Sequence, residues 1–355
     1  MHKASSDTLR VSVVVPVYNR PSELRELLAA LVLQSVDSAE FEVLICDDGS
    51  TVDLRAVVDE FNTMNSLQIH YFRQHNQGPG IARNLGLHNA GGAIVAFTDS
   101  DCIPEPEWLS ELIGPIETSS VGMTGGLVDF RTADHLSGRC VNYLMSSMLG
   151  AGGARDPRAA LHMRYYPRAG NTAVRRELAC AAGGFSGQRH GEDIEFSNRI
   201  LQMRTKIEFV PTAVVVHNEK KNSRQVAMEA FQKGTARIRL AREQGVHELI
   251  HTLPALLVVG LTASALTGLF LPAFSKIAGI PTVLYAIVLA LIGLHGGFLL
   301  KDVRALLLLP FYASLMHIGY GAGYLYAFLT DPSTSVSLER QTVAAKSPHD
   351  GMSEQ

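Results

Sequence analysis

Residues 11–50 read VSVVVPVYNRPSELRELLAALVLQSVDSAEFEVLICDDGS, and their pattern predicts the class of fold. It contains two short runs rich in β-branched residues, Val11–Val17 and Phe41–Cys46, which are typical of buried strands. Between them, Ser22–Gln34 carries leucines at helical spacing, and Pro21 supplies a helix start signal. A strand, a helix and a second strand in direct succession predict a parallel sheet covered by helices.

The same alternation continues after this stretch. Leu67–Phe72 and Ala93–Thr98 are predicted strands, and Val52–Phe61 and Ile81–Asn89 are predicted helices. We therefore expect an α/β fold with a mostly parallel, Rossmann-like sheet and helices on both faces. Ligands of such sheets bind beyond the carboxyl ends of the strands, so the residues that follow each strand are the candidates for function.

The overall composition argues against some functions and suggests that part of the chain lies in a membrane. Of 355 residues, 46% are hydrophobic and only 18% are charged, against about 25% in a typical soluble protein. The net charge of -3 gives no basic excess, so nucleic acid is not an expected partner. The four cysteines are scattered, which supports neither a disulfide framework nor a zinc knuckle.

Three apolar runs follow residue 252: Leu253–Leu271, Ile280–Leu300 and Ala305–Leu329. Each is about 20 residues long, which suffices to cross a hydrocarbon core of about 30 Å. Core helices of a soluble second domain are the weaker alternative, because few soluble helices are apolar on all sides over this length. The expected parts are a polar segment 1–10, a catalytic domain 11–220, an amphipathic juxtamembrane linker 221–252, an anchor of about three transmembrane helices 253–329 and a disordered polar tail 330–355.

The distribution of basic residues predicts the orientation in the membrane. Three arginines lie within residues 237–242, before the first run, and Lys301 and Arg304 lie between the second and third, whereas Lys276 lies on the opposite side. With a polar N-terminus that lacks a signal peptide, this pattern predicts a multi-pass protein of the inner membrane with its catalytic domain in the cytoplasm. Three crossings would place the tail outside, and a re-entrant or interfacial run would reverse that.

An Asp99-Ser100-Asp101 sequence directly follows a predicted strand. In an extended strand, residues i and i+2 share a face, so the two carboxylates could converge on one cation. Oxygen ligands suit Mg²⁺ or Mn²⁺, which in turn binds a diphosphate. A D-x-D sequence alone is often a solvated turn, and its place after a buried strand favours the metal site here.

Two further polar groups follow the second and third strands. Asp47 and Asp48 could accept hydrogen bonds from a base or a ribose, or could simply cap the next helix. Residues 78–84 open a helix with two glycines, and Arg83 could pair with a phosphate or hold a loop carboxylate. No G-K-[ST] sequence follows, so this is not a Walker motif.

The last candidates lie in the second half of the domain. Glu192 and Asp193 precede a helical pattern, where they could cap the helix or supply a general base for an acceptor hydroxyl. His217 ends an apolar strand and could complete a metal shell with Asp101, or lie at the surface without a function.

Taken in order, these motifs resemble glycosyltransferase family 2, the inverting enzymes with a GT-A fold. The resemblance covers about Val11–Asn218, and the chain is most similar to bacterial exopolysaccharide and cell-envelope transferases with a C-terminal helical anchor. The residues that carry the resemblance are Val11–Asn19, Asp47–Ser50, Ala82–Asn84, Asp99–Asp101, Gly183–Phe185 and Glu192–Asp193.

The resemblance also implies roles for individual residues. It implies donor binding by Pro16, Tyr18, Asp47, Asp48, Arg83, Asp99, Ser100 and Asn171. It implies a metal ion, Mg²⁺ or Mn²⁺, on Asp101, and an acceptor pocket shaped by Gly183, Gly184 and Phe185. Asp193 would be the general base, with Glu192 beside it.

One departure from the family limits the expected reaction. Processive synthases of the family carry a Q-x-x-R-W signature, but the single tryptophan of this chain is Trp108. We therefore expect transfer of one sugar from a nucleotide-diphosphate sugar, with UDP as the expected nucleotide, to a glycan or a lipid-linked acceptor. The alternatives are an inactive nucleotide-sugar-binding subunit of an assembly complex and a nucleotidyltransferase, although the latter needs a glycine-rich phosphate loop that Val15–Arg20 lacks.

Overall fold

The computed structural model describes residues 9–64, 67–129, 135–152, 157–158, 165–217, 222–246 and 248–330. Most of the predicted N-terminal polar segment and the predicted disordered tail after residue 330 lie outside these ranges. The chain divides into two compact units, one formed by Met1–Ser223 with Val283–Ser314 and the other by Arg224–Thr282 with Leu315–Gln355.

The first unit begins with the predicted alternation of strands and helices. Its first elements are β1 (Val11–Val17), α1 (Pro21–Val32), β2 (Phe41–Asp47), α2 (Arg55–Thr63), β3 (Gln68–Arg73), α3 (Pro79–Asn89) and β4 (Ile94–Thr98). Strands β3, β2, β1 and β4 are neighbours in that order and run parallel. Val14 of β1 lies opposite Leu44 on one side and Phe97 on the other.

The remaining elements of the domain extend this sheet beyond β4. They are β5 (Cys102–Pro104), α4 (Trp108–Thr118), β6 (Val121–Asp129), α5 (Leu136–Ser146), α6 (Met148–Ala151), β7 (Asn171–Arg175), α7 (Arg176–Ala181), α8 (Glu192–Gln202) and β8 (Lys206–His217). Within the described residues the sheet has eight strands, in the order β3-β2-β1-β4-β7-β6-β8-β5. Because β7 is antiparallel to β4 and β6, and β5 to β8, the sheet is mixed.

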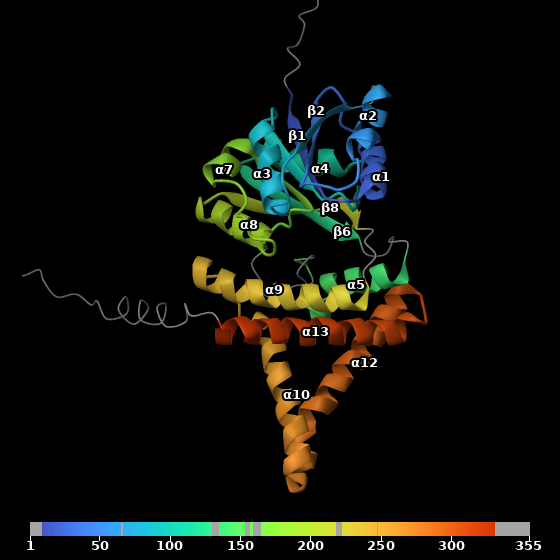
Figure 1. Cartoon of the computed structure of the whole chain (residues 1–355), viewed down its shortest axis with the longest axis vertical. Coiled ribbons are helices and arrows are strands. Elements are labelled where there is room, and N and C mark those ends of the chain that lie inside the picture. Colours follow the sequence, from blue (N-terminus) through green and yellow to red (C-terminus); the bar gives the residue numbers. More distant parts are fainter. Residues whose placement is uncertain are drawn as a thin grey trace, which may run out of the picture. The chain divides into compact units, whose positions relative to one another are not determined.

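Helices cover both faces of the sheet, as the sequence predicts (Figure 1). The side chains of Val13 and Val15 join the buried cluster formed with α1, α2 and α4. Val14 points to the opposite face and joins the cluster formed with α3, α7 and α8. This alternation within one strand fixes the register, since a shift by one residue would exchange the two faces.

Helix α3 approaches the sheet closely, and this places its N-terminus at the site described below. A Cβ atom on Gly86 would lie 2.3 Å from Cγ1 of Val14 and 2.9 Å from Sγ of Cys46. Only a glycine permits this approach without movement of the strands.

The C-terminal part is helical. It consists of α9 (Ser223–Gln244), a 3₁₀ turn (Leu249–Thr252), α10 (Leu253–Phe270), a second 3₁₀ turn (Pro272–Phe274), α11 (Ser275–Ala278), α12 (Ile280–Leu300) and α13 (Ala305–Thr330). Three of the described helices are long and apolar enough to cross a membrane, and they coincide with the three predicted apolar runs.

Candidate active site

The predicted functional residues gather at the carboxyl ends of β1, β2 and β4, where the N-terminus of α8 and the end of β8 join them. The loops after the three parallel strands meet because the strands are neighbours in the sheet. Asn19, which has a positive φ of 54°, ties the first two loops together. Its backbone N–H donates to Oγ of Ser50 at 2.8 Å, and its Oδ1 accepts from the N–H of Thr51 at 2.8 Å.

This link leaves Tyr18 in an open position. Pro16 is buried near the end of β1, whereas Tyr18 is 45% exposed although it is a large aromatic residue. An exposed aromatic ring at the end of a parallel strand can stack on a planar base.

Asp47 and Asp48 are both buried, and protein groups already contact their oxygens. Asp48 accepts hydrogen bonds of 2.8 Å from the side chain of Gln74 and from the backbone N–H groups of Gln77 and Gly78. Asp47 accepts from the N–H of Ser50 and from the hydroxyl of Tyr71. Asp48 therefore holds the start of α3 against β2, which is a structural task beside any contact with a nucleotide.

The Asp99-Ser100-Asp101 sequence lies in a turn, and this corrects one step of the prediction. The N–H of Cys102 donates to the carbonyl of Asp99 at 3.0 Å, which closes a turn after β4. The argument that residues i and i+2 share a face of an extended strand does not apply in a turn. Asp99 contacts Arg83, Asp101 contacts Arg20 and His217, and Ser100 between them is buried.

Arg83 joins the acids of β4 to those of α8. One Nη donates to Asp99 at 2.6 Å and the other to Glu192 at 3.0 Å, and the guanidinium lies over the ring of Phe185 at 5.4 Å. Arg83 is only 4% exposed. Burial alone would lower the pKa of Arg83, but the charges of Asp99 and Glu192 outweigh it and raise the pKa above its usual value. Of the two roles open from the sequence, the geometry favours that of holding loop carboxylates.

Glu192 and Asp193 differ sharply in their surroundings. Burial, together with the charge of Asp193, raises the pKa of Glu192 to about 7, although Arg83 opposes the shift. The side chain of Asp193 is 20% exposed and lies 3.5 Å from Nη1 of Arg168. Asp193 is therefore the more accessible of the two acids, whereas Glu192 is engaged with Arg83 inside the protein.

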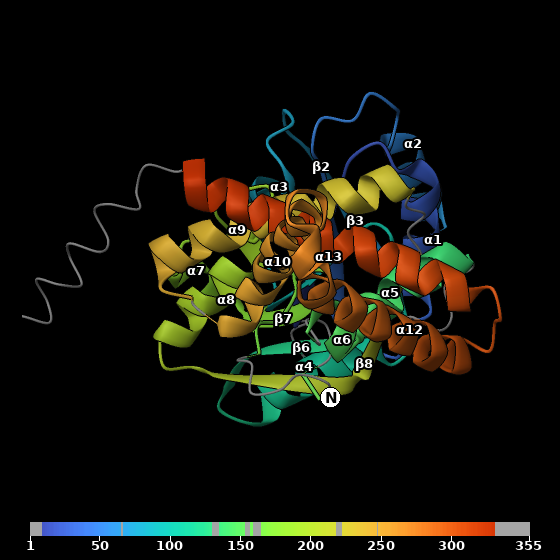
Figure 2. The same ribbon diagram turned by 90° about the horizontal axis from the view of Figure 1, so that it is seen from below.

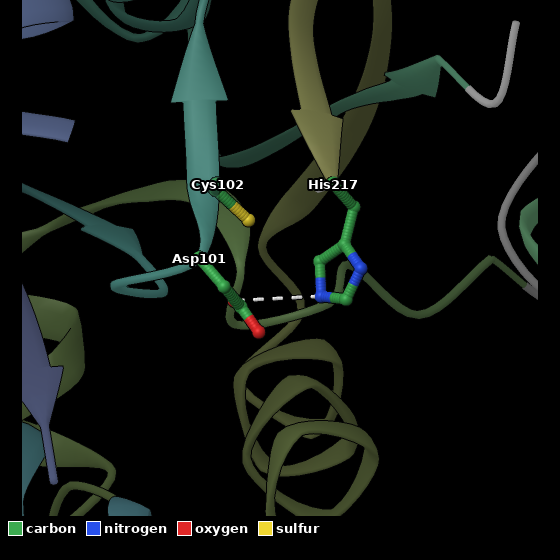
Figure 3. Close-up of side chains that lie close together, drawn as sticks. All are labelled: Asp101, Cys102 and His217. Atoms are coloured by element: carbon green, nitrogen blue, oxygen red, sulfur yellow. Dashed lines mark ion pairs between the residues drawn. The ribbon is translucent and has the colours of Figure 1, made fainter. Parts of the chain in front are cut away.

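Three potential metal ligands lie together near the end of the turn Asp99–Cys102. The ligand atoms of Asp101, Cys102 and His217 are all within 4.8 Å of one another (Figure 3). Oδ1 of Asp101 and Nε2 of His217 are 3.4 Å apart, close to the separation of about 3 Å expected for neighbouring ligands of one ion. The carboxylate fits Mg²⁺ or Mn²⁺, the imidazole suits a transition metal such as Mn²⁺ better than Mg²⁺, and a thiol is a poor ligand for either of these hard cations. Arg20 also contacts Asp101, so a cation would have to share this carboxylate with a guanidinium.

Asn171 lies at the start of β7, with its side chain engaged inside the sheet. Its Oδ1 accepts from the indole N–H of Trp108 at 2.8 Å, and its Nδ2 donates to the carbonyls of Leu127 and Ala213 at 3.0 Å. Asn171 is 2% exposed. It ties together strands β6, β7 and β8 beneath the turn that carries Asp99.

Gly183, Gly184 and Phe185 shape the loop before α8. Both glycines have positive φ values, and a Cβ atom on Gly184 would lie 2.3 Å from Oδ1 of Asn84. Asn84 accepts from the N–H of Phe185 and donates to its carbonyl. The Phe185 ring is buried against Phe97 and Phe196. This packing fixes the loop before α8 to the core of the domain.

The sequence argument did not single out two basic residues of this site, Arg20 and Arg168. Arg20 pairs with Asp101 and Arg168 lies beside Asp193. Arg20 follows a strand end and could have been noticed on that ground. Arg168 belongs to no motif, and only the folded chain brings it to α8.

Comparison with known proteins agrees with this geometry. The sequence model described as "Glycosyl transferase family 2" matches residues 12–189, about half of the chain. Glycosyltransferase AglE of Haloferax volcanii is 36% identical over 121 residues, which are 34% of this chain and 40% of that protein. The pre-mycofactocin glycosyltransferase of Mycobacterium tuberculosis is 29% identical over 231 residues, 64% of this chain and 46% of that protein. The chain thus spans less than half the length of these curated relatives.

A solved structure supports the fold. The mannosyltransferase PcManGT from Pyrobaculum calidifontis, in complex with GDP-Man and Mn²⁺, matches with a TM-score of 0.55 over 92% of this chain and 90% of that one, at 20% identity. The order of the motifs, the mixed sheet covered by helices and the matching sequence model lead to one assignment: the chain belongs to glycosyl transferase family 2 and has the GT-A fold.

Proposed function

We propose that this protein transfers a single sugar from a nucleotide-diphosphate sugar to a hydroxyl of a glycan or a lipid-linked acceptor, in polysaccharide or cell-envelope biosynthesis. The observation that carries the proposal is the convergence of acids at one edge of the sheet: Arg83 pairs with both Asp99 and Glu192, while Asp101 follows in the same turn as Asp99 and Asp193 adjoins Glu192. Relatives named as glycosyltransferases agree with the reaction class.

In the proposed reaction, Asp193 is the general base. Its carboxylate takes the proton of the acceptor hydroxyl while the hydroxyl oxygen attacks the anomeric carbon. The bond between that carbon and the diphosphate oxygen breaks, the nucleoside diphosphate leaves with the electron pair, and the anomeric configuration inverts. Asp193 suits this role because it is partly exposed, whereas Glu192 is buried on Arg83.

We assign the donor side to the loops after β1, β2 and β4. Tyr18 would stack on the base beside Asp48, and Asp99 and Ser100 would lie near the ribose and the donor sugar. Asp101 and His217 would hold Mg²⁺ or Mn²⁺, which when bound neutralises charge on the diphosphate leaving group. Arg83 would act by fixing Asp99 and Glu192, since both of its Nη atoms are paired inside the protein.

The anchor fits an acceptor that resides in the membrane. We place the protein in the inner membrane with its catalytic domain in the cytoplasm, because basic residues precede α10 and follow α12. A lipid-linked acceptor would then reach Asp193 without leaving the bilayer surface. Equal rates on lipid-linked and on free water-soluble sugars would contradict this part of the proposal.

The test is a transfer assay with a panel of UDP- and GDP-sugars, with and without Mn²⁺, on the full chain in detergent or lipid nanodiscs. We expect Asp193→Asn to abolish transfer while donor binding persists. The matched control is Asp59→Asn, which alters an exposed aspartate of α2 and should leave the rate unchanged. Equal transfer by wild type and Asp193→Asn would refute the proposed base, and donor binding without turnover in wild type would favour the alternative of an inactive binding subunit.

A further inference from the structure

Helix α13 resembles a transmembrane helix in composition but not in its packing. In the most apolar 18-residue stretch of each long helix, 6% is buried inside the protein for α10 and 11% for α12, whereas 33% is buried for α13. A helix surrounded by lipid would bury little, so the partners of α13 decide where it lies.

In the second unit, the later part of α13 lies directly on α9. A Cβ atom on Gly319 would be 2.8 Å from the carbonyl oxygen of Ala227, and one on Gly323 would be 2.0 Å from that of Phe231. Further along both helices, Nη2 of Arg242 lies 3.4 Å from the carbonyl oxygen of Phe328. The contacts advance in the same direction along the two helices, so α13 follows α9 over several turns (Figure 1).

Helix α9 cannot enter the hydrocarbon core. It carries five arginines and lysines between Arg224 and Arg242 and two glutamates. Ionisable side chains at the centre of a bilayer are strongly unfavourable, and an amphipathic cationic helix belongs at the headgroup level. Because α13 touches α9 backbone to backbone, that part of α13 must lie at the same depth.

In the first unit, the start of α13 packs on the end of α12, which in turn contacts the catalytic domain. Leu309 and Ala313 are fully buried, and Leu309 lies against Gly296 of α12. The same end of α12 contacts α5, where the hydroxyl of Tyr143 lies 2.6 Å from Nδ1 of His295. Helix α5 is part of the catalytic domain, since Asn142 donates to the carbonyl of His217 at 2.8 Å.

The face of α13 that protein does not cover is apolar. Leu307, Phe311, Ile318 and Leu329 are 80%, 50%, 43% and 77% exposed. At 100° per residue these four positions fall on one stripe along the helix. Lys301 and Arg304 precede the stripe and are exposed, as expected for side chains at a headgroup layer.

We propose that α13 lies flat in the membrane interface, with this stripe in the acyl chains of a phospholipid surface, and that only α10 and α12 cross the bilayer. In the second unit the end of α10 and the start of α12 form a hairpin, with Oγ of Ser264 3.1 Å from Oγ1 of Thr282. Figure 2, seen from below, shows α10 end-on while the later part of α13 runs across it. Two crossings return the chain to its starting side, so Thr330 lies on the side of the catalytic domain.

A second copy of the chain is the other possible cover for the stripe, but lipid suits it better. The exposed side chains of α10 and α12 are also largely apolar, so a bilayer must cover those two helices in any case. A hollow of about 850 Å³ at the turn from α12 to α13, lined by Phe298, Val303 and Leu306 with Lys301, also suits an acyl chain below a phosphate headgroup.

Cysteine labelling tests the number of crossings. The chain has one exposed cysteine, Cys180 in the catalytic domain, and the other three are buried. In a Cys180→Ser background, Thr330→Cys and Ala273→Cys place single thiols at the end of α13 and between α10 and α12. With a membrane-impermeant maleimide, we expect Thr330→Cys to label in the same vesicle orientation as native Cys180 and Ala273→Cys in the opposite one. Labelling of Thr330→Cys together with Ala273→Cys would overturn the proposal.

A depth measurement does not depend on sidedness. Leu307 and Leu329 are separated by about 33 Å along a helix axis, enough to span the hydrocarbon core if α13 were upright. Spin labels at Leu307, Phe311, Ile318 and Leu329 should all report similar shallow depths by oxygen and nickel-complex accessibility in nanodiscs, while labels at Val283, Ile287 and Leu291 of α12 should show a gradient. A gradient along α13, or labels shielded from lipid and cross-linked between copies, would refute it.

Discussion

Replacing Arg83 by methionine removes the only positive charge that contacts both Asp99 and Glu192 among the described ion pairs. Breaking a buried ion pair by removing one partner costs about 3–5 kcal/mol. Asp99 is 34% exposed and can be solvated by water, whereas the side chain of Glu192 is 9% exposed and cannot. We therefore expect the lower end of this range, about 3 kcal/mol.

For a domain of this size, about 3 kcal/mol lowers the Tm by about 6–12 °C. The assay is thermal unfolding followed by tryptophan fluorescence. Trp108 is the single tryptophan of the chain and is buried in the catalytic domain, so the signal reports on this domain and not on the membrane helices.

Two further variants give this prediction its controls. Arg25→Met removes a partner of the exposed Arg25–Glu60 pair and should leave the Tm nearly unchanged. Adding Glu192→Gln to Arg83→Met removes the stranded acid and should restore part of the loss, with a coupling of about 1–3 kcal/mol. If Arg83→Met is no less stable than Arg25→Met, or if Glu192→Gln brings no recovery, Arg83 does not hold these acids together.

Other substitutions test the electrostatics, the metal ligands and the support beneath the site. The folded state raises the pKa of Glu192 from 4.5 to about 7, so its protonated form stabilises the fold below pH 4.5 and this contribution is lost as the pH rises to about 7. In urea unfolding, wild type should therefore lose stability relative to Glu192→Gln across this window, and parallel curves would contradict the shift. Asp101→Asn and His217→Ala should each raise the Mn²⁺ concentration needed for half-maximal transfer by about 10-fold or more, while Cys102→Ser should not. If Cys102→Ser has the largest effect, the ion is a softer metal. Asn171→Ala leaves buried hydrogen-bonding groups without partners and should lower the free energy of unfolding by about 2–4 kcal/mol, and an unchanged urea midpoint would refute this.

The first half of the fold follows from local patterns in the sequence. Strands β1, β2 and β4 are buried on both faces and read as continuous apolar runs, whereas the edge strand β3 is partly exposed. Helices α1 to α3 between the strands keep a helical period or a start signal. The bounds of these elements therefore lie close to the predicted ones. The mixed character of the second half could not be read in this way, because the direction of β7 depends on its pairing with β4 and β6 and not on its composition.

The site was predictable in position and less so in its contacts. Residues at strand ends meet at one edge of a parallel sheet, which is why Asp48, Asp99 and Asp101 were expected together. The pairing of Arg83 with Glu192 spans 109 positions of the chain, and no local pattern encodes it. Asn171 looked like a ligand for the donor sugar, yet its hydrogen bonds fasten three strands. A buried polar residue can serve either purpose, and the sequence does not separate them.

The position of a bound Mn²⁺ ion tests the central claim most directly. Crystals of the full chain grown with a nucleoside diphosphate and Mn²⁺ would reveal the ion by its anomalous scattering. We expect the peak between Asp101 and His217, with the diphosphate on the same edge of the sheet as Asp193. A peak at another surface, or a nucleotide bound away from β1, β2 and β4, would contradict the assignment of these acids to one active site.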